Sequence, residues 1–192
     1  MRQKITGAIY AAILLLSSGL GTLHAQDHAS GSAAKLSLAL GRPTDRSITL
    51  SVLSATKIEA HVEYGTKPGT YTVKTDARII NPVIPVEFEL GSLTPNTRYH
   101  YRVGTQEGTF HTQRAPGSAF TFALQGDSHP ERAGKMFDAR LYAQTLRNVV
   151  QDAPDFYLTL GDDFSIERLI ERQSLDQVAV DQVYARQRDF LG

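Results

Sequence analysis

Phe120–Asp163 reads FTFALQGDSHPERAGKMFDARLYAQTLRNVVQDAPDFYLTLGDD, and this stretch indicates the fold class of the second half of the chain. Two short apolar runs in it, Phe120–Leu124 and Phe156–Leu160, have the length and composition of strands. The apolar residues between these runs recur at helical spacing, and they are Ala139, Tyr142, Ala143, Leu146, Val149 and Val150. The stretch therefore predicts a strand–helix–strand unit with parallel strands and a right-handed crossover.

A Gly-Asp pair follows each of the two predicted strands, and the two aspartates are Asp127 and Asp162. A glycine before each aspartate allows the backbone to turn sharply. Because the carboxyl ends of parallel strands meet at one edge of a sheet, both pairs are expected at the edge where open α/β sheets bind ligands. His129, two residues after Asp127, is expected at the same edge.

These residue types indicate a metal site. Two carboxylates and an imidazole suit Zn, Fe or Mn, so Asp127, His129 and Asp162 are the candidate ligands. In the alternative interpretation each aspartate caps a following helix and His129 is an ordinary loop residue. Two Gly-Asp pairs at matching strand ends favour the metal site. Asp163, which follows Asp162, is expected to cap the next helix or to orient a ligand from the second shell.

At Asp127-Ser128-His129 and Gly161-Asp162 the chain resembles the calcineurin-like metallophosphoesterases. The resemblance implies that Asp127 and His129 bind one ion and that Asp162 bridges two ions of Fe, Zn or Mn. It further implies that a metal-bound hydroxide hydrolyses a phosphate ester. The later motifs of the family do not occur between Asp163 and Gly192, so residues 119–192 correspond to a truncated, N-terminal part of its catalytic domain. The chain by itself is therefore expected to be inactive.

Residues 35–112 have a different pattern, in which apolar and polar residues alternate with a period of two. Such alternation is typical of strands with one buried face, and turn signals separate the runs. Many short strands without a helical period predict a β-sandwich. The inward positions of the four clearest runs are Ile48, Leu50 and Val52; Ile58, Ala60, Val62 and Tyr64; Val86, Phe88 and Leu90; and Tyr99, Tyr101 and Val103.

The segment Leu93–Tyr101, LTPNTRYHY, matches a tyrosine corner, in which the hydroxyl of Tyr99 bonds to the backbone upstream. This segment resembles fibronectin type III domains and the N-terminal sandwich of purple acid phosphatases. In the stretch Gly161–Ser165, GDDFS, Ser165 stands where the corresponding motif of purple acid phosphatases has a tyrosine. The resemblance thus implies their sandwich but not their tyrosinate-bound iron.

The N-terminus has the pattern of a secretory signal peptide over residues 1–25, with a basic start, an apolar stretch and small residues before the cleavage point. An uncleaved anchor is the alternative, although the apolar stretch is short for a membrane span. Residues 26–34 are read as a flexible lead-in, and residues 113–118 as a hinge. The chain is therefore expected to be exported to the periplasm or the extracellular space, with no membrane contact in the mature form.

Composition limits the possible partners. The formal net charge is +0 and the chain has no cysteine, so nothing indicates nucleic-acid binding and disulfides are excluded. No glycine-rich phosphate loop follows the first strand of the α/β part, which disfavours a nucleotide-binding domain.

The predicted fold is an all-β, fibronectin type III-like sandwich followed by the first βαβ portion of an α/β metallophosphoesterase domain. The predicted function is that of an exported, purple acid phosphatase-like hydrolase acting on phosphate esters. The alternative from another class is a noncatalytic extracytoplasmic binding module that carries a degenerate remnant of such a domain.

Overall fold

A computed structural model describes residues 35–191. The predicted signal peptide (1–25) and lead-in (26–34) lie outside the described residues. Among the helices of the described part, none is long and apolar enough to cross a membrane. The strands of residues 35–112 are β1 Leu36–Gly41, β2 Ile48–Ser54, β3 Ile58–Ala60, β4 Glu63–Gly65, β5 Val73–Lys74, β6 Arg78–Ile80, β7 Val86–Leu90, β8 Arg98–Val103 and β9 Gln106–His111.

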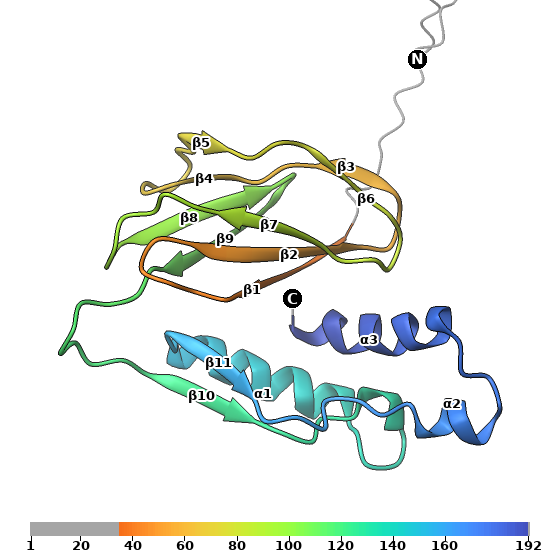
Figure 1. Cartoon of the computed structure of the whole chain (residues 1–192). Coiled ribbons are helices and arrows are strands. Elements are labelled where there is room, and N and C mark those ends of the chain that lie inside the picture. Colours follow the sequence, from red (N-terminus) through yellow and green to blue (C-terminus); the bar gives the residue numbers. More distant parts are fainter. Residues whose placement is uncertain (1–34, 192) are drawn as a thin grey trace, which may run out of the picture. The chain divides into compact units, whose positions relative to one another are not determined.

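These strands form antiparallel sheets that pack around one core, which confirms the predicted β-sandwich (Figure 1). One sheet has the order β1-β2-β7, a second has the order β5-β4-β8-β9, and β3 pairs with β6. In β2 the inward residues Ile48, Leu50 and Val52 are buried, whereas Thr49 and Ser51 are half-buried. Each fully buried aliphatic side chain of this kind contributes roughly 1.5–3 kcal/mol, so the alternating pattern supplies most of the stability of the sandwich.

The run Ile58–Tyr64, predicted as one strand, is divided into β3 and β4. β3 pairs with β6, whereas β4 lies between β5 and β8 in the four-stranded sheet. The chain changes sheets at Val62, whose amide donates to Thr75 Oγ1 over 3.0 Å and whose carbonyl accepts from the Thr75 amide over 2.9 Å. Side-chain alternation continues through this corner, so the sequence pattern does not reveal the break.

The tyrosine corner is present as predicted. The Tyr99 hydroxyl accepts a hydrogen bond from the backbone N–H of Thr94 at 2.9 Å. The ring of Tyr99 stacks on Phe110, with 5.4 Å between the ring centroids, and both residues belong to the sandwich core. Through Tyr99 the turn before β8 is thus held against the core of the sandwich.

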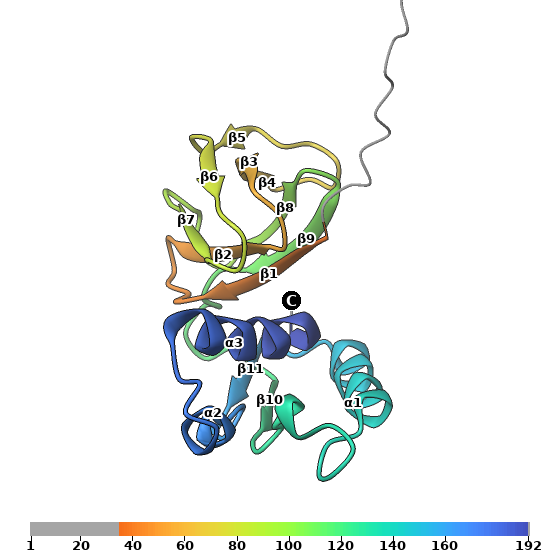
Figure 2. The same ribbon diagram turned by 90° about the vertical axis from the view of Figure 1, so that its right-hand side faces the viewer.

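The second part of the chain contains the predicted strand–helix–strand unit (Figure 2). Its strands are parallel, with Phe122 opposite Phe156 and Leu124 opposite Leu158. Asp138 caps the connecting helix, because its carboxylate accepts from the backbone N–H groups of Arg140 and Leu141 in the first turn. The elements of this part are β10 Phe122–Gln125, η1 Pro130–Arg132, α1 Ala139–Asp152, β11 Phe156–Thr159, α2 Glu167–Glu171 and α3 Gln177–Leu191.

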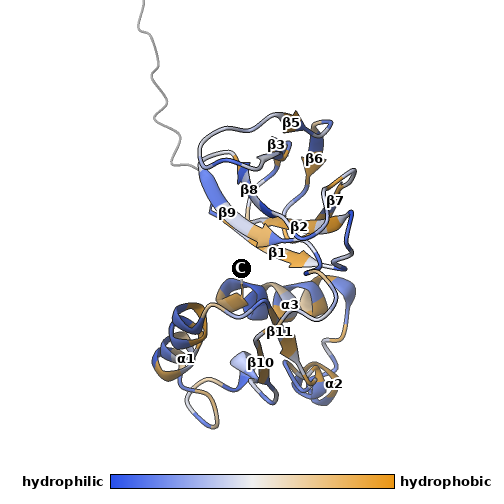
Figure 3. Cartoon of the chain, turned by 90° about the vertical axis from the view of Figure 1, so that its left-hand side faces the viewer, coloured by the Kyte–Doolittle hydropathy of each residue, from blue (hydrophilic) through white to orange (hydrophobic). Residues whose placement is uncertain are grey.

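The two faces of the β10–β11 sheet differ. Side chains on one face, including Tyr157 and Gln125, are half-buried, whereas those on the other are exposed. The exposed face consists of phenylalanine and leucine, and β11 carries the hydrophobic colour in Figure 3. The sheet therefore presents its apolar side to solvent.

Helix α3 is anchored to the sandwich by Arg188, whose side chain is buried. All five N–H donors of its guanidinium are used, because it bonds to the hydroxyl and the carbonyl of Ser37 in β1, to the same two groups of Ser51 in β2, and to the Tyr184 hydroxyl. Each of these bonds is 3.0–3.1 Å long. The charge is thus solvated by neutral oxygens of β1 and β2 and by the hydroxyl of Tyr184 in α3.

Candidate metal centre

The loops after β10 and β11 are joined by backbone hydrogen bonds. The amide of Leu160 donates to the carbonyl of Gln125 at 2.7 Å, and the amide of Asp127 donates to the carbonyl of Gly161 at 3.1 Å. These bonds continue the parallel ladder past the strand ends. They place both Gly-Asp pairs at one edge of the sheet, as the sequence predicts.

The backbone of all three candidate ligands is left-handed, with φ of 61° at Asp127, 46° at His129 and 53° at Asp162. Asp and His tolerate this conformation better than most residues, and such positions concentrate at functional sites. Gly161, with φ of 97°, needs its lack of a side chain. Gly126 does not have positive φ, so the prediction that both glycines provide the sharp turn holds only for the second.

Asp127, His129 and Asp162 each offer one ligand atom, and these atoms lie within 4.8 Å of one another. His129 Nε2 is 3.0 Å from Asp127 Oδ1. Metal–ligand bonds of about 2.0–2.2 Å put two ligands of one ion at most about 4.4 Å apart. Small side-chain rotations would therefore bring all three atoms onto one ion. The imidazole is buried while both carboxylates are exposed, so the site opens to solvent.

Glu131 orients the imidazole, and the sequence interpretation missed it. Its Oε1 lies 2.8 Å from His129 Nδ1 and accepts from the Ser165 amide at 3.0 Å. A carboxylate on one ring nitrogen leaves the other, Nε2, to face a ligand. The other oxygen of Glu131 is buried and has no hydrogen-bond partner among the described residues. The only signal in the sequence was an acidic residue two positions after the histidine.

Asp163 lies beside the site but not in the ligand group. Its Oδ1 is buried without a partner in the described part of the chain, and its carbonyl accepts from the Ser128 hydroxyl at 3.1 Å. The prediction that it caps the next helix is wrong, because α2 begins at Glu167 with Ile166 as its N-cap. That Asp163 orients a metal ligand stays a prediction.

The capping interpretation of the other candidate ligands is also wrong. The short helix η1 has His129 at its N-cap and no side-chain cap. His61, His100 and His111 belong to the sandwich, where each is half-buried. Within residues 35–191, the cluster of Asp127, His129 and Asp162 is the one group of metal-ligating side chains found.

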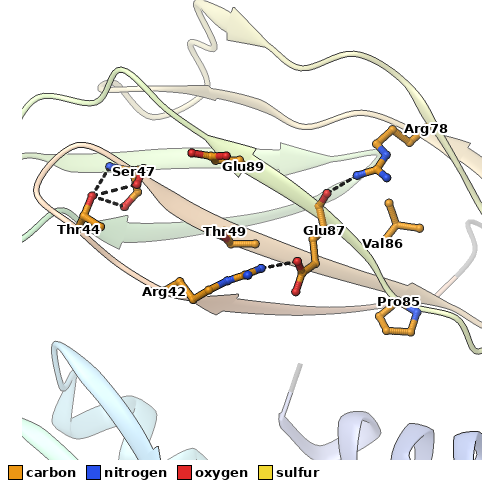
Figure 4. Close-up of a pocket in the computed structure, with 9 residues that line it drawn as sticks. All are labelled: Arg42, Thr44, Ser47, Thr49, Arg78, Pro85, Val86, Glu87 and Glu89. Carbon is orange, nitrogen blue, oxygen red and sulfur yellow. Dashed lines mark hydrogen bonds and ion pairs between the residues drawn. The ribbon is translucent and has the colours of Figure 1, made fainter.

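An open hollow of about 820 Å³ lies over β2 and β7 of the sandwich, as Figure 4 shows. Its two arginines are both bonded to Glu87: Arg42 pairs with the carboxylate and Arg78 donates to the carbonyl. Glu87 thus offsets the positive charge of Arg42 in this hollow, and the hollow is a weaker candidate than the strand-end cluster. Its lining residues are Arg42, Thr44, Ser47, Thr49, Arg78, Pro85, Val86, Glu87 and Glu89.

Comparison with known proteins gives no family. No family model matches the chain, and no curated protein matches it. Among solved structures, it is similar to the sensor domain of the anti-sigma factor RsgI4 of Pseudobacteroides cellulosolvens, with 15% identity, a TM-score of 0.36, and coverage of 42% of this chain and 76% of that one. A redesigned β-sandwich protein is similar at 20% identity and a TM-score of 0.30, over 40% of this chain and 90% of that one.

These findings correct the identification made from the motifs. The similar structures named above are a sensor domain and a redesigned sandwich, and neither a family model nor a curated protein supports a metallophosphoesterase. The predicted metallophosphoesterase or purple acid phosphatase, its hydrolase activity on phosphate esters and its enzyme class are therefore wrong. The physical reason lies in the motifs, because Asp-x-His and Gly-Asp at strand ends also suit left-handed turns, which these residues form in this chain.

Proposed function

We propose that this chain is a noncatalytic extracytoplasmic binding module that holds a divalent metal ion at Asp127, His129 and Asp162. The proposal rests on one observation: the three ligand atoms lie within 4.8 Å of one another on two loops that are joined by hydrogen bonds. The buried, unpartnered oxygens of Glu131 and Asp163 support it, since a cation nearby would offset the cost of burying them.

The site is open to solvent, since the side chain of Asp127 is 69% exposed. A donor group of a bound partner can therefore reach an ion held there. Three protein ligands leave at least one coordination position of Zn²⁺ open. Water would fill that position, or a donor group of a bound partner would.

Isothermal titration of the chain with ZnCl₂ and with MnCl₂ tests the proposal. Asp162→Asn is expected to weaken binding by more than about 100-fold, because losing an outer partner of a ligand already costs about 10–100-fold. Asp76→Asn, which changes an exposed carboxylate between β5 and β6, is the matched control and should bind like the parent chain. No binding by the parent chain, or equal affinity in both variants, would contradict the proposal.

The same titration reports the number of ions bound. The sequence predicts two ions, and the cluster of three ligands supports at least one. At a free metal concentration of about 100 times Kd, binding should stabilise the folded state by about 2.7 kcal/mol. Thermal unfolding with and without metal measures this gain.

Export is the second part of the proposal. It is supported by the basic, apolar and small-residue order of residues 1–25. N-terminal sequencing of exported material should begin at Gln26 or within a few residues of it. Mature material that keeps Met1 would argue for the uncleaved anchor instead.

A further inference from the structure

The exposed face of the β10–β11 sheet is an apolar surface made of phenylalanine and leucine. The register places the side chains of Phe122, Leu124, Phe156 and Leu158 on one face, because side chains alternate along each strand. Phe120 and Leu160 extend this surface at its two ends. We call these six residues the Phe–Leu face.

The exposure of the Phe–Leu face is unusual for its type of sheet. Its six side chains are 45–67% exposed, although parallel sheets normally have both faces covered. The rings of Phe120, Phe122 and Phe156 lie 5.4–6.1 Å apart and form one continuous aromatic cluster. On the other side of the sheet lies α1 (Figures 1 and 2). No described helix covers the Phe–Leu face itself.

The area of the face is that of a docking surface. At roughly 200 Å² for each aromatic side chain, the exposed parts of the three phenylalanines amount to roughly 300 Å². The three leucines bring the face to roughly 500–600 Å², which is at the upper end of the apolar patches on monomeric proteins. Two such faces packed together would bury roughly 1,000–1,200 Å², which clears the roughly 1,000 Å² expected of a biological interface.

We propose that the Phe–Leu face binds the Phe–Leu face of a second copy of the chain in a symmetric dimer. None of its six side chains carries a charge, so an occupant has to be apolar, and a second copy supplies an identical surface. The formal net charge of +0 means that two copies approach without overall repulsion. The two sheets would pack face to face at about 10 Å, as in sandwich proteins.

Sedimentation equilibrium of the purified chain tests the dimer. The parent chain should have twice the mass of one chain, and Phe122→Glu should have the mass of one, because a charge would be buried at the interface. Ile79→Glu is the matched control, since it places the same charge at an exposed strand position of the sandwich, and should remain a dimer. Circular dichroism of each variant checks its fold.

Cross-linking provides a readout that does not depend on a disruptive substitution. The chain has no cysteine, so a single introduced cysteine reports one position. A bismaleimide that spans about 10 Å should convert Leu124→Cys into a covalent dimer, because facing sheets about 10 Å apart hold these thiols too far apart for a disulfide. It should leave Val150→Cys, on the exposed side of α1, monomeric. A monomeric parent chain would overturn the proposal, even if an apolar dye bound the face. A dimer that Phe122→Glu leaves intact, or equal cross-linking of both cysteine variants, would also overturn it.

Discussion

His129 is held on both sides of its ring, and its partner Glu131 is itself fixed by the Ser165 amide. This arrangement makes the candidate site dependent on a residue that would not touch the metal. A carboxylate bonded to the free ring nitrogen of a ligating histidine selects its tautomer and raises its basicity. Single polar groups of this kind, rather than packing, determine the geometry at the strand ends.

Replacing Glu131 with glutamine is therefore expected to weaken metal binding about 10-fold, the lower end of the range for an outer partner. The amide keeps an acceptor for the Ser165 N–H but loses the negative charge beside the imidazole. Titration calorimetry measures the change, with Glu171→Gln at an exposed position of α2 as control. Equal affinities in these two variants would show that Glu131 does not position the histidine.

Tyr99→Phe should lower the free energy of unfolding by about 1–3 kcal/mol, because it leaves the Thr94 N–H unpaired inside the tyrosine corner. Tyr101→Phe is the comparison within the same strand, since the hydroxyl of Tyr101 makes no side-chain hydrogen bond found in the described residues. Urea unfolding followed by circular dichroism measures both. A loss for Tyr101→Phe as large as that for Tyr99→Phe would contradict the role of the corner.

The phenol of Tyr157 makes the free energy of unfolding depend on pH in the alkaline range. Burial, with smaller contributions from Tyr142 and Asp163, raises its pKa from 10.0 to about 12. Since the folded state favours the neutral phenol, this contribution to stability is full below pH 10 and is lost as the pH rises towards 12. Tyr157→Phe should remove the part of the stability loss that comes from ionisation of this phenol. Urea unfolding of both chains across this range tests it, and parallel pH profiles would contradict it.

Among the elements, α3 depends on one side chain for its place against β1 and β2. The guanidinium of Arg188 is buried without a carboxylate, so its charge is balanced by hydrogen-bond acceptors and by the Tyr184 ring, whose centroid is 5.9 Å from Cζ. An unpaired buried polar group costs about 1–3 kcal/mol. The complete use of its five donors therefore makes this position intolerant of shorter or apolar side chains.

Arg188→Met is expected to destabilise the docking of α3 by about 3 kcal/mol, because groups of Ser37 and Ser51 lose their donors. Arg186→Met, at a more accessible position of the same helix, is the matched control. Hydrogen exchange should become faster in α3 and at the β1 edge in the first variant only. Unchanged protection there would mean that the helix is held by other contacts.

At the scale of the whole molecule, residues 35–191 have one principal hydrophobic core, and every residue of that core lies between Leu36 and Phe110. The α/β part has small aromatic clusters, such as Phe137, Tyr142 and Phe190, in place of a comparable core. The sandwich is therefore expected to be more stable than the α/β part. Part of the apolar surface of the α/β part is the exposed Phe–Leu face.

An excised fragment of residues 35–112 should fold alone, because the core and the tyrosine corner are complete within it. Loss of α3 leaves the polar groups of Ser37 and Ser51 to water, which can solvate them. A cooperative urea transition with a β-type circular dichroism spectrum is the expected result. A disordered spectrum would show that the sandwich needs the rest of the chain.

The sequence by itself determined the periodic features of this protein. Alternation along β2, β7 and β8 predicted the sandwich, and helical spacing between two apolar runs predicted the parallel strand pair that brings Asp127 and Asp162 together. These features are local, since side-chain period and turn chemistry depend on neighbouring residues. The motif-based identification as a phosphoesterase failed because short loop motifs report a turn as well as they report a reaction.

Only the tertiary structure decided the remaining features, because they join residues that are far apart in the chain or depend on how elements pack. It divided the run Ile58–Tyr64 between two sheets, and it placed Arg188 on serines more than a hundred residues earlier. It also bonded Glu131 to the amide of Ser165 in the other loop and left the Phe–Leu face open. None of these has a period or a spacing that a sequence can carry, since burial and hydrogen-bond partners are set by how the elements pack.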